Sequence, residues 1–162
     1  NLGDQGRGMD RENLEKSVIT LEPKAHSRGK ADRAAVEVPA ENLQNLMRQL
    51  SQNDRFSFDM LLDHTAIDRI AEGKFELVYN LYSTKHAHYL MVSCLIDRNN
   101  PVVPTVSGIW PIAHWQEREV FDLFGILYDG HTDLRRIFLD DDWLGHPLRK
   151  DYSDAGMLEF EK

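Results

Sequence analysis

Acidic, basic and aromatic side chains alternate along residues 115–152, which read WQEREVFDLFGILYDGHTDLRRIFLDDDWLGHPLRKDY. Arg118 and Asp122 are four residues apart, so they can pair on one face of a helix. The arginines of two cationic pairs, Arg135-Arg136 and Arg149-Lys150, can bind carboxylates through forked hydrogen bonds. Isolated surface ion pairs stabilise a protein little, but arginines interleaved with aromatic side chains are typical of protein interfaces. This stretch therefore indicates a contact surface.

Proton-transfer chemistry is weakly indicated in the same stretch. Glu117 and Glu119 are two residues apart on a predicted helix and point in different directions, so a carboxylate pair that shares a proton is not expected. His131 and His146 have no indicated nucleophile or base partner, which favours structural hydrogen bonds at turns. No residue is predicted to be catalytic.

Metal and thiol chemistry are also weakly indicated. His86 and His88 would share a face of a strand, but their neighbourhood supplies no third ligand, so loop histidines are favoured. The run Asp140-Asp141-Asp142 lacks the alternating ligands and the bend glycine of a calcium loop. Cys94, the one cysteine, cannot alone form an intrachain disulfide, a zinc site or an iron–sulfur site, and is expected to be an inert core thiol. No metal or cofactor site is predicted in this chain.

The overall composition narrows the function classes. The 162 residues carry a formal net charge of −8, which argues against a generic nucleic-acid binder and against adsorption to anionic lipid through charge alone. No apolar run approaches the ~20 residues of a membrane-spanning helix, and residues 1–16 lack the apolar centre of a signal peptide. We expect a soluble chain, or one that reaches a membrane only through partners.

The elements that must position the charged stretch begin after a polar segment. Residues 1–35 are predicted to be a polar N-terminal extension with modest local structure, including a short helix capped by Asp10. A strand at Val36–Val38 is followed by a helix over residues 40–51. The apolar stripe of that helix is formed by Leu43, Leu46, Met47 and Leu50.

Four further strands and one helix are predicted. The strands cover residues 56–62, 75–82, 89–96 and 102–106, and the third is apolar at nearly every position, as in a central strand. Pro111 begins the helix and Gly125 ends it. The side chains expected to pack inward from this helix are Trp115, Val120, Phe121 and Phe124. Those expected on its other faces are Glu117, Arg118, Glu119 and Asp122.

Together these elements predict an α+β fold, in which a helix pair packs on a small, mostly antiparallel sheet and an irregular C-terminal arm follows. The predicted divisions are the extension (1–35), the α+β domain (36–128) and the irregular arm (129–162). Irregular segments of that length are usually functional or tails. We expect the arm to need a partner subunit to become ordered.

The stretch from Trp115 to Tyr152 resembles the signature of a known family, the thirty-kilodalton or C subunit of respiratory complex I. The matching positions are ERE at 117–119, Asp122, FGI at 124–126, GH at 130–131, DLRRI at 133–137 and GHPLRKDY at 145–152. A looser similarity extends upstream to about residue 36. A signature of this length is far more specific than a short motif. Thr132 stands where a proline is usual and His114 where Asn or Asp is common, which leaves the charged part intact.

The resemblance implies a non-catalytic scaffold in the hydrophilic, peripheral arm of a proton-pumping NADH–quinone oxidoreductase, a translocase of the respiratory electron-transport chain. It implies docking on the large quinone-site subunit and on neighbouring iron–sulfur subunits. FMN, iron–sulfur clusters and quinone are expected in those partner subunits, so enzymatic activity would belong to the complex. The implied location is the cytoplasmic face of the bacterial inner membrane, or the matrix side of the inner mitochondrial membrane.

The same resemblance places the contacts with other subunits in the signature. The predicted interface residues are Trp115, Glu117, Arg118, Glu119, Asp122, Phe124, Gly125, His131, Asp133, Arg135, Arg136, Trp143, Pro147, Arg149, Lys150, Asp151 and Tyr152.

Two alternatives stay open beside this hypothesis. The first is the equivalent scaffold subunit of a related membrane-bound hydrogenase or formate-hydrogenlyase-type complex, which can carry a similar signature. The second is a free-standing acidic enzyme that uses Glu117 or His131, which would need a pocket with perturbed carboxylates. The full Arg135-Arg136 and 147–152 elements favour the respiratory complex.

Overall fold

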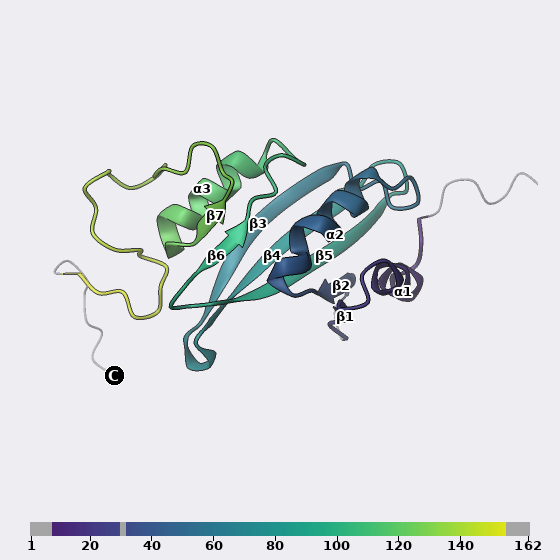
Figure 1. The fold of residues 1–162 in the computed structure, drawn as a ribbon, viewed down its shortest axis with the longest axis horizontal. Helices are drawn as coiled ribbons and strands as arrows, with labels where there is room; N and C mark the ends of the chain where they lie inside the picture. The colour runs from purple at the N-terminus through teal and green to yellow at the C-terminus, as the bar shows by residue number, and fades with distance from the viewer. Residues whose placement is uncertain (1–7, 30–31, 155–162) are drawn as a thin grey trace, which may run out of the picture.

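The main sheet has five strands in the order β1-β2-β5-β4-β3 in the computed structural model, which describes residues 8–29 and 32–154 (Figure 1). The strands are β1 (His26–Ser27), β2 (Ala34–Glu37), β3 (Met60–Arg69), β4 (Lys74–Ser83) and β5 (His88–Asp97). Neighbouring strands of this sheet are antiparallel except for the parallel pair β2–β5. The predicted α+β fold with a mostly antiparallel sheet is therefore confirmed, and β5 is its central strand.

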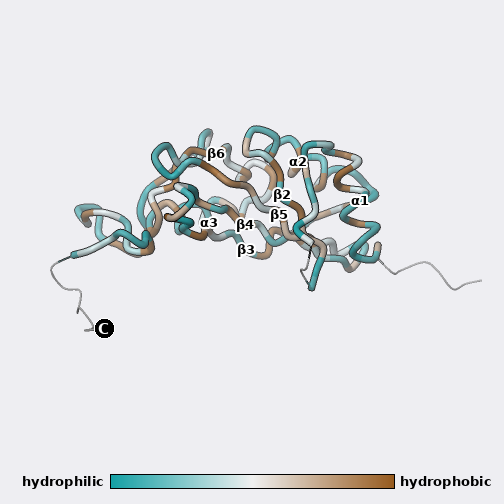
Figure 2. The backbone as a smooth tube through the Cα atoms, turned by 90° about the horizontal axis from the view of Figure 1, so that it is seen from below, coloured by the Kyte–Doolittle hydropathy of each residue, from teal (hydrophilic) through white to brown (hydrophobic). Residues whose placement is uncertain are grey.

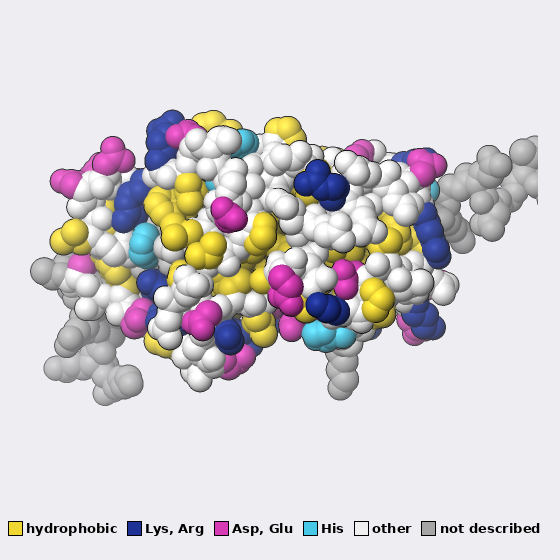
Figure 3. Space-filling model, viewed as in Figure 1, with side chains coloured by type: hydrophobic (Ala, Val, Ile, Leu, Met, Phe, Trp, Pro, Cys, Tyr) yellow, Lys and Arg dark blue, Asp and Glu magenta, His cyan; other side chains and the backbone are white. Residues whose placement is uncertain are grey.

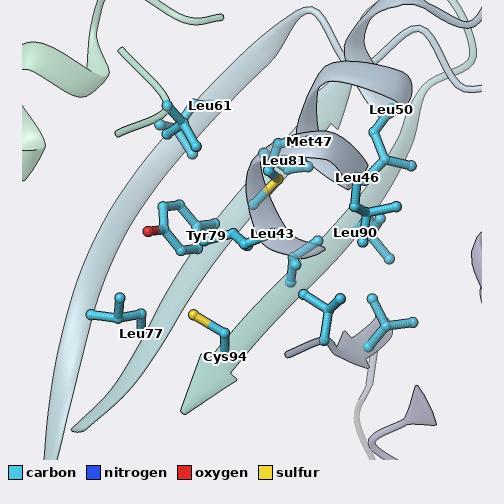
Figure 4. Close-up of a cluster of buried hydrophobic side chains, with 14 of the residues drawn as sticks. Leu43, Leu46, Met47, Leu50, Leu61, Leu77, Tyr79, Leu81, Leu90 and Cys94 are labelled. Atoms are coloured by element: carbon cyan, nitrogen blue, oxygen red, sulfur yellow. The ribbon is translucent and has the colours of Figure 1, made fainter. Parts of the chain in front are cut away.

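Helix α2 (Ala40–Gln52) covers one side of this sheet (Figures 1 and 2). Its predicted apolar stripe is fully buried and consists of Leu43, Leu46, Met47 and Leu50. Figure 4 shows the stripe lying over the strand residues Tyr79, Leu81 and Leu90. Cys94 lies in the same cluster, where burial raises the pKa of its thiol to about 12. Because each buried aliphatic side chain contributes ~1.5–3 kcal/mol, this contact is a major source of stability.

Helix α1 (Arg11–Leu21) belongs to the same core. Its N-cap is Asp10, as predicted, and the Asp10 side chain accepts a hydrogen bond from the backbone N–H of Asn13 at 3.0 Å. Leu14 and Val18, one helical turn apart, are buried in the core. The structure thus differs from the expected extension with modest local structure, while the domain boundary at residue 36 stays a prediction.

The strand predicted over residues 56–62 is wrong in position. Phe58 is buried before the strand starts, and β3 covers Met60–Arg69 instead. A bulge between Leu61 and Asp63 shifts the alternation, so that Leu61 is buried before it and His64 and Ala66 are buried after it. The short 3₁₀ helix η1 (Ile70–Glu72) then connects β3 to β4. The sequence has an apolar residue at every second position from Phe56 to Leu62, but nothing in it signals the bulge. The predicted strand therefore began too early.

A second, small sheet joins the segments on either side of α3. Strand β6 (Val102–Pro104) pairs in parallel with β7 (Leu127–Asp129). Directly after β6, the backbone N–H of Thr105 donates to the carbonyl oxygen of Asp129 at 2.9 Å. This pairing brings the loop before α3 next to the beginning of the C-terminal segment.

Helix α3 (Ala113–Phe124) lies beside β3 (Figure 1) and ends at Gly125, as predicted. Val120 and Phe124 face the core, also as predicted. Other assignments for this helix are wrong. Trp115 is 59% exposed, whereas three of the charged side chains expected on the outer faces are buried, namely Glu117, Arg118 and Asp122. Another part of the chain must therefore cover that face of the helix.

Candidate functional site

The segment that covers α3 is residues 130–154, which we call the C-terminal arm. Within the described residues it contains neither helix nor strand. In Figure 1 it leaves β7, passes along α3 and loops out beyond the end of that helix. Contacts within this chain hold it along its length, which differs from the expectation that a partner is needed to order it.

Asp122 of α3 fixes the middle of the C-terminal arm. Its carboxylate is fully buried, and Oδ2 accepts the backbone N–H groups of residues 137–139 at 3.0, 2.8 and 3.1 Å. Oδ1 accepts a hydrogen bond from Arg136 at 2.7 Å. Burial opposes ionisation, but these hydrogen bonds outweigh it and lower the pKa of Asp122. The carboxylate therefore stays charged and acts as a hub for four donors.

Arg136 spreads its guanidinium over carbonyl groups from two segments. Nη1 donates to the backbone oxygen of Asp122 at 3.0 Å. Nη2 donates to the carbonyl oxygens of Trp143 and Gly145 at 2.9 and 3.0 Å. A planar fork of donors suits this arrangement and a lysine ammonium does not. Arg136 thus closes the loop of residues 136–145 onto α3.

The C-terminal arm also caps the end of α3, where helix carbonyls lack intrahelical partners. His146 Nδ1 bonds the carbonyl oxygen of Asp122 at 3.0 Å. The N–H of Leu148 donates to the carbonyl oxygen of Leu123, also at 3.0 Å. Gly125 follows with a φ of 75°, and a Cβ there would come within 2.6 Å of the His146 ring. Glycine is required at this position both for its backbone conformation and for space.

Asp68 of β3 fixes the end of the C-terminal arm. Its buried carboxylate accepts from Arg98 at 2.9 and 3.1 Å and from the backbone N–H of Lys150 at 2.8 Å. The Arg98 hydrogen bonds lower the pKa of Asp68, against the opposing effect of burial. Arg98 also donates to Asp151 at 2.6 Å. The hairpin end of the main sheet is thereby joined to residues 150–151.

Arg118 fixes the beginning of the C-terminal arm. The buried guanidinium donates to the carbonyl oxygens of Arg135 and Arg136 at 3.2 and 3.1 Å. It lies 5.0 Å from the centre of the Trp115 ring, within the range of a cation–π contact. The predicted pair of Arg118 with Asp122 is therefore not formed, because each takes its partners from the arm.

Glu117, the third buried carboxylate of this region, faces the loop after β6. Oε2 accepts from the Thr105 hydroxyl at 2.5 Å, and Oε1 accepts from the N–H of Val106 at 2.8 Å. The nearest imidazole nitrogen, His131 Nε2, lies 4.0 Å from Oε2. Burial raises the pKa of Glu117 to about 7.

Large apolar side chains are exposed on the outer side of this region. The exposed fractions are 63% for Phe138, 86% for Leu144 and 51% for Leu148, beside 59% for Trp115. We call these four residues the arm surface. Figure 3 shows hydrophobic side chains interspersed with charged ones over the end of the molecule that carries α3 and the arm. Exposed apolar groups with a polar surround mark interaction sites, so the arm surface is the candidate site.

The structure divides the predicted interface residues into two groups. The exposed group consists of Trp115, Glu119, Asp133, Arg135, Trp143, Lys150 and Asp151. The group that is buried or half-buried within this chain consists of Glu117, Arg118, Asp122, Phe124, Gly125, His131, Arg136, Pro147, Arg149 and Tyr152. Arg118, Asp122 and Arg136 of the second group bond the C-terminal arm. The first group is the more accessible to another subunit, and the predicted interface itself stays a prediction.

Several residues of the candidate site and of its anchoring contacts were missed from the sequence. Phe138, Leu144 and Leu148 stand at irregular spacing in a segment without periodicity, so nothing marked them as exposed. Asp68 and Arg98 lie outside the signature, and Asp68 is 82 residues from its arm partner Lys150. Only a three-dimensional arrangement brings such residues together.

The two histidines weighed as half of a metal site, His86 and His88, are bound to backbone groups. His86 and His88 place Nε2 2.8 and 3.0 Å from the carbonyl oxygens of Asp54 and Phe56. In the described ranges, no group of three or more His, Cys, Asp or Glu side chains is arranged to hold a metal ion. Nor does this part of the chain contain a helix long and apolar enough to cross a membrane.

Comparison with known sequences gives one consistent result. The model of the family described as respiratory-chain NADH dehydrogenase, 30 Kd subunit, matches residues 36–157. The C subunit of the NADH-quinone oxidoreductase of Moorella thermoacetica is 40% identical over 141 residues, which are 87% of this chain and 94% of that protein. The C subunit of the Acidithiobacillus ferrooxidans enzyme is 41% identical over 131 residues, 76% of this chain and 65% of that protein. This chain thus spans slightly less than two-thirds of the second relative.

Solved structures agree with the sequence comparison. A chain of the membrane-bound sulfane sulfur reductase, an archaeal respiratory membrane complex, superposes with a TM-score of 0.76 and 30% identity, covering 89% of this chain and 86% of that one. A trypsin-resistant fragment of Nqo5 superposes with a TM-score of 0.62 and 26% identity, covering 78% of this chain and all of the fragment. The family match contains the whole signature stretch together with Asp68, Glu117 and Asp122.

Proposed function

The chain belongs to the respiratory-chain NADH dehydrogenase 30 Kd subunit family, and we propose that it is a non-catalytic structural subunit of a proton-pumping NADH–quinone oxidoreductase. The observation that carries the proposal is the arm surface: exposed apolar side chains on α3 and on an irregular segment that hydrogen bonds within this chain hold against that helix. Asp122 and Asp68 act as hydrogen-bond hubs, which is a structural use of a buried carboxylate. A preorganised contact surface lowers the ordering cost of association.

The proposed partners are the large quinone-site subunit and the neighbouring iron–sulfur subunits of the peripheral arm. FMN, the iron–sulfur clusters and the quinone would be bound by those partners. The assembly would then hold this chain on the cytoplasmic face of a bacterial inner membrane, or on the matrix side in a mitochondrion. Support comes from the relatives, which are named as C subunits of NADH-quinone oxidoreductases, and from the match to a chain of a respiratory membrane complex.

Replacement of Leu144 by aspartate tests the arm surface. Leu144 is 86% exposed, so Leu144→Asp should leave the thermal unfolding of the isolated chain unchanged while the complex recovered by gentle detergent extraction falls severalfold. Tyr89→Ser is the matched control, since Tyr89 is a 39% exposed apolar side chain at the opposite end of the sheet. Equal recovery of the complex with both variants would show that the arm surface is not the contact.

Replacement of Arg135 by alanine tests the signature itself. The Arg135 side chain is 66% exposed and pairs only with Asp133 among the described residues, so a partner can reach it. Arg135→Ala should lower the amount of assembled complex, whereas Arg48→Ala, an exposed arginine on α2, should not. A normal amount of complex with reduced turnover would contradict the scaffold role of Arg135.

A second candidate function is the equivalent subunit of a related membrane-bound complex without an NADH module, such as a hydrogenase. The observation that favours this second candidate is the match to the sulfane sulfur reductase chain. The TM-score of that match is 0.76, against 0.62 for the match to the Nqo5 fragment. Identification of the chains that copurify in detergent separates the two. A flavin-binding NADH module among them supports the first candidate, and its consistent absence supports the second.

A further inference from the structure

Strand β5 is apolar at nearly every position, which is typical of a strand that is covered on both faces. Leu77 and Cys94 are core residues that pair across β4 and β5. Because side chains alternate along a strand, the paired residues Glu76 and Leu95 lie on the other side of the sheet. Figure 2 shows α2 on one side of these strands, and within the described residues no helix covers the other side. We call that other side the outer face.

A buried carboxylate lies on the outer face between two arginines. Glu76 is 1% exposed and pairs with Arg28, from the segment after β1, and with Arg69, at the end of β3. Arg69 donates from Nε to Glu76 at 2.6 Å and from Nη1 to Glu72 at 3.2 Å. Arg28 reaches across β5, where Nη1 also donates to the Ser93 hydroxyl at 3.2 Å. Two guanidinium groups thus share one buried carboxylate.

Arg28 keeps donors that no described residue accepts. Its Nη1 has two acceptors, whereas Nε and Nη2 have none within residues 8–29 and 32–154. The side chain is 26% exposed, so water can reach these donors in the free chain. A protein that covered Arg28 would remove this water, and it must then supply an acceptor to offset the desolvation. A carboxylate suits this place best, since it matches the guanidinium fork in both charge and geometry.

Aliphatic side chains surround the two arginines. Ile67 and Leu95 flank Glu76 in one row across β3, β4 and β5. Ile67 is 44% exposed, Leu95 is half-buried, and Ile70 in the adjoining η1 is 41% exposed. An open face of an antiparallel sheet is ordinarily polar, whereas exposed apolar groups beside arginines mark contact surfaces. The outer patch, as we call this set, consists of Arg28, Ile67, Arg69, Ile70 and Leu95.

We propose that the outer patch is a second contact surface, which binds an apolar surface of another subunit that places a carboxylate on Arg28. The inference rests on the proposed function, because it takes the partner from the same complex. A second copy of this chain fits less well, since the carboxylates beside Arg28 and Arg69, of Glu72 and Glu76, are already paired with arginines. The outer patch shares no residue with the arm surface, so the two can bind different subunits.

Photo-crosslinking in the complex extracted with gentle detergent tests the partner. A photoreactive phenylalanine analogue at position 67 should crosslink to a different subunit, within a peptide that contains Asp or Glu. The same analogue at position 48, on the exposed face of α2, is the control and should give no such product. The proposal would be overturned by a crosslink to a second copy of this chain, by a peptide without a carboxylate side chain, or by no crosslink at all.

Two variants test the groups that carry the proposal. Ile67→Asp should leave the thermal unfolding of the isolated chain unchanged and lower the recovery of the complex severalfold. Tyr89→Ser, at a 39% exposed position on the same face but at the opposite end of β5, should retain full recovery. Arg28→Gln should also lower recovery, whereas Arg33→Gln, whose guanidinium lies 4.2 Å from the centre of the Tyr89 ring, should not.

Folding of the arginine variant is checked separately. Arg69 remains as a partner of Glu76 in Arg28→Gln, so we expect this variant to fold. If it does not, Arg28→Lys keeps the charge beside Glu76 and loses the fork, and it should lower recovery in the same way. Full recovery of the complex with Ile67→Asp, or with the arginine variant that folds, would overturn the proposal.

The arm-surface variant separates this inference from the proposed function. Loss of the complex in Leu144→Asp but not in Ile67→Asp would overturn the outer patch alone. Loss in Ile67→Asp but not in Leu144→Asp would support the outer patch and overturn the arm surface. Recovery of the unmodified chain without any other subunit would overturn both.

Discussion

Helices α2 and α3 hold their neighbours by different physical means. The α2 contact consists of aliphatic side chains that are fully buried against the sheet (Figure 4). Apolar packing of this kind is non-directional and contributes a large part of the folding free energy. The α3 contact with the C-terminal arm instead depends on Asp122, Arg118 and Arg136, whose hydrogen bonds each specify one backbone position. Because desolvation offsets much of the gain from a buried ion pair, this contact contributes more to shape than to net stability.

This difference suits the role proposed for the C-terminal arm as a contact surface and the role of the α2 contact in stabilising the fold. A contact surface made of loop must have one conformation if it is to bind without a large entropic cost. Directed bonds from a helix can impose that conformation where strands and helices are lacking, as along residues 130–154. The α2 contact does not need one exact arrangement of side chains, since hydrophobic cores tolerate repacking.

The largest effect on global stability is expected from Leu46→Ala. The side chain is fully buried in the α2 contact, so the cavity should lower the free energy of unfolding by ~2–5 kcal/mol. Urea denaturation followed by circular dichroism measures this change. Arg48→Ala, on the exposed face of the same helix, should change it by less than ~0.5 kcal/mol. A small effect of Leu46→Ala would break the comparison, because α2 would then not be the main stabilising contact.

Asp122→Asn is expected to act locally on the other contact. An asparagine cannot keep the charge that Arg136 and three amides require, so the local opening free energy of the arm should fall by ~2–4 kcal/mol. Hydrogen exchange of the amides of residues 137–139 should accelerate accordingly, while exchange in α2 stays unchanged. Asp140→Asn, at an exposed position of the arm, is the control. If Asp122→Asn accelerated hydrogen exchange in α2 as much as in residues 137–139, the α2 contact and the arm contact would not be independent.

The pH dependence of stability sharpens the comparison further. Glu117 has a pKa of about 7 in the folded chain, above the ordinary 4.5, so the folded state binds more protons between these values. Its contribution is fully present below about pH 4.5 and is lost as the pH rises through 7, by up to a few kcal/mol. Asp122, with its lowered pKa, contributes in the opposite sense and loses its effect in acid. Denaturation of the unmodified chain and of Glu117→Gln from about pH 5 to 8 should diverge, and parallel curves would exclude the Glu117 contribution.

A small effect on stability is expected from Trp115→Ala. Trp115 is 59% exposed and its ring contacts the Arg118 guanidinium, so the free energy of unfolding should change by less than ~1 kcal/mol. Recovery of the complex should nevertheless fall, as expected for an aromatic anchor. Phe121→Ala is a contrasting variant, because Phe121 is half-buried beside His146 and should cost more stability. A larger loss of stability in Trp115→Ala than in Phe121→Ala would show that Trp115 packs in the core.

The longer regular elements other than β3, and the family, were determined by the amino-acid sequence alone. The stripe of Leu43 to Leu50, the alternation in β4, the apolar run of β5 and the end of α3 at Gly125 all follow from local periodicity and backbone preferences. The start of α3 lies at Ala113, two residues after the predicted Pro111. The charged stretch from 115 to 152 was sufficient to identify the family, whose model matches residues 36–157. Its residue types also indicated a role in contacts rather than in catalysis.

Which residues make those contacts was decided only by the tertiary structure. The sequence paired Arg118 with Asp122 by their spacing and turned Trp115 inward, but the arm covers the polar face of α3 and supplies both charged residues with partners of its own. Asp68 meets Lys150 only because the hairpin end and the arm converge. Periodicity reports the face of an element that is apolar, not the face that a distant segment will cover. The path of an irregular segment depends on hydrogen bonds between residues far apart in the chain, which no local pattern encodes.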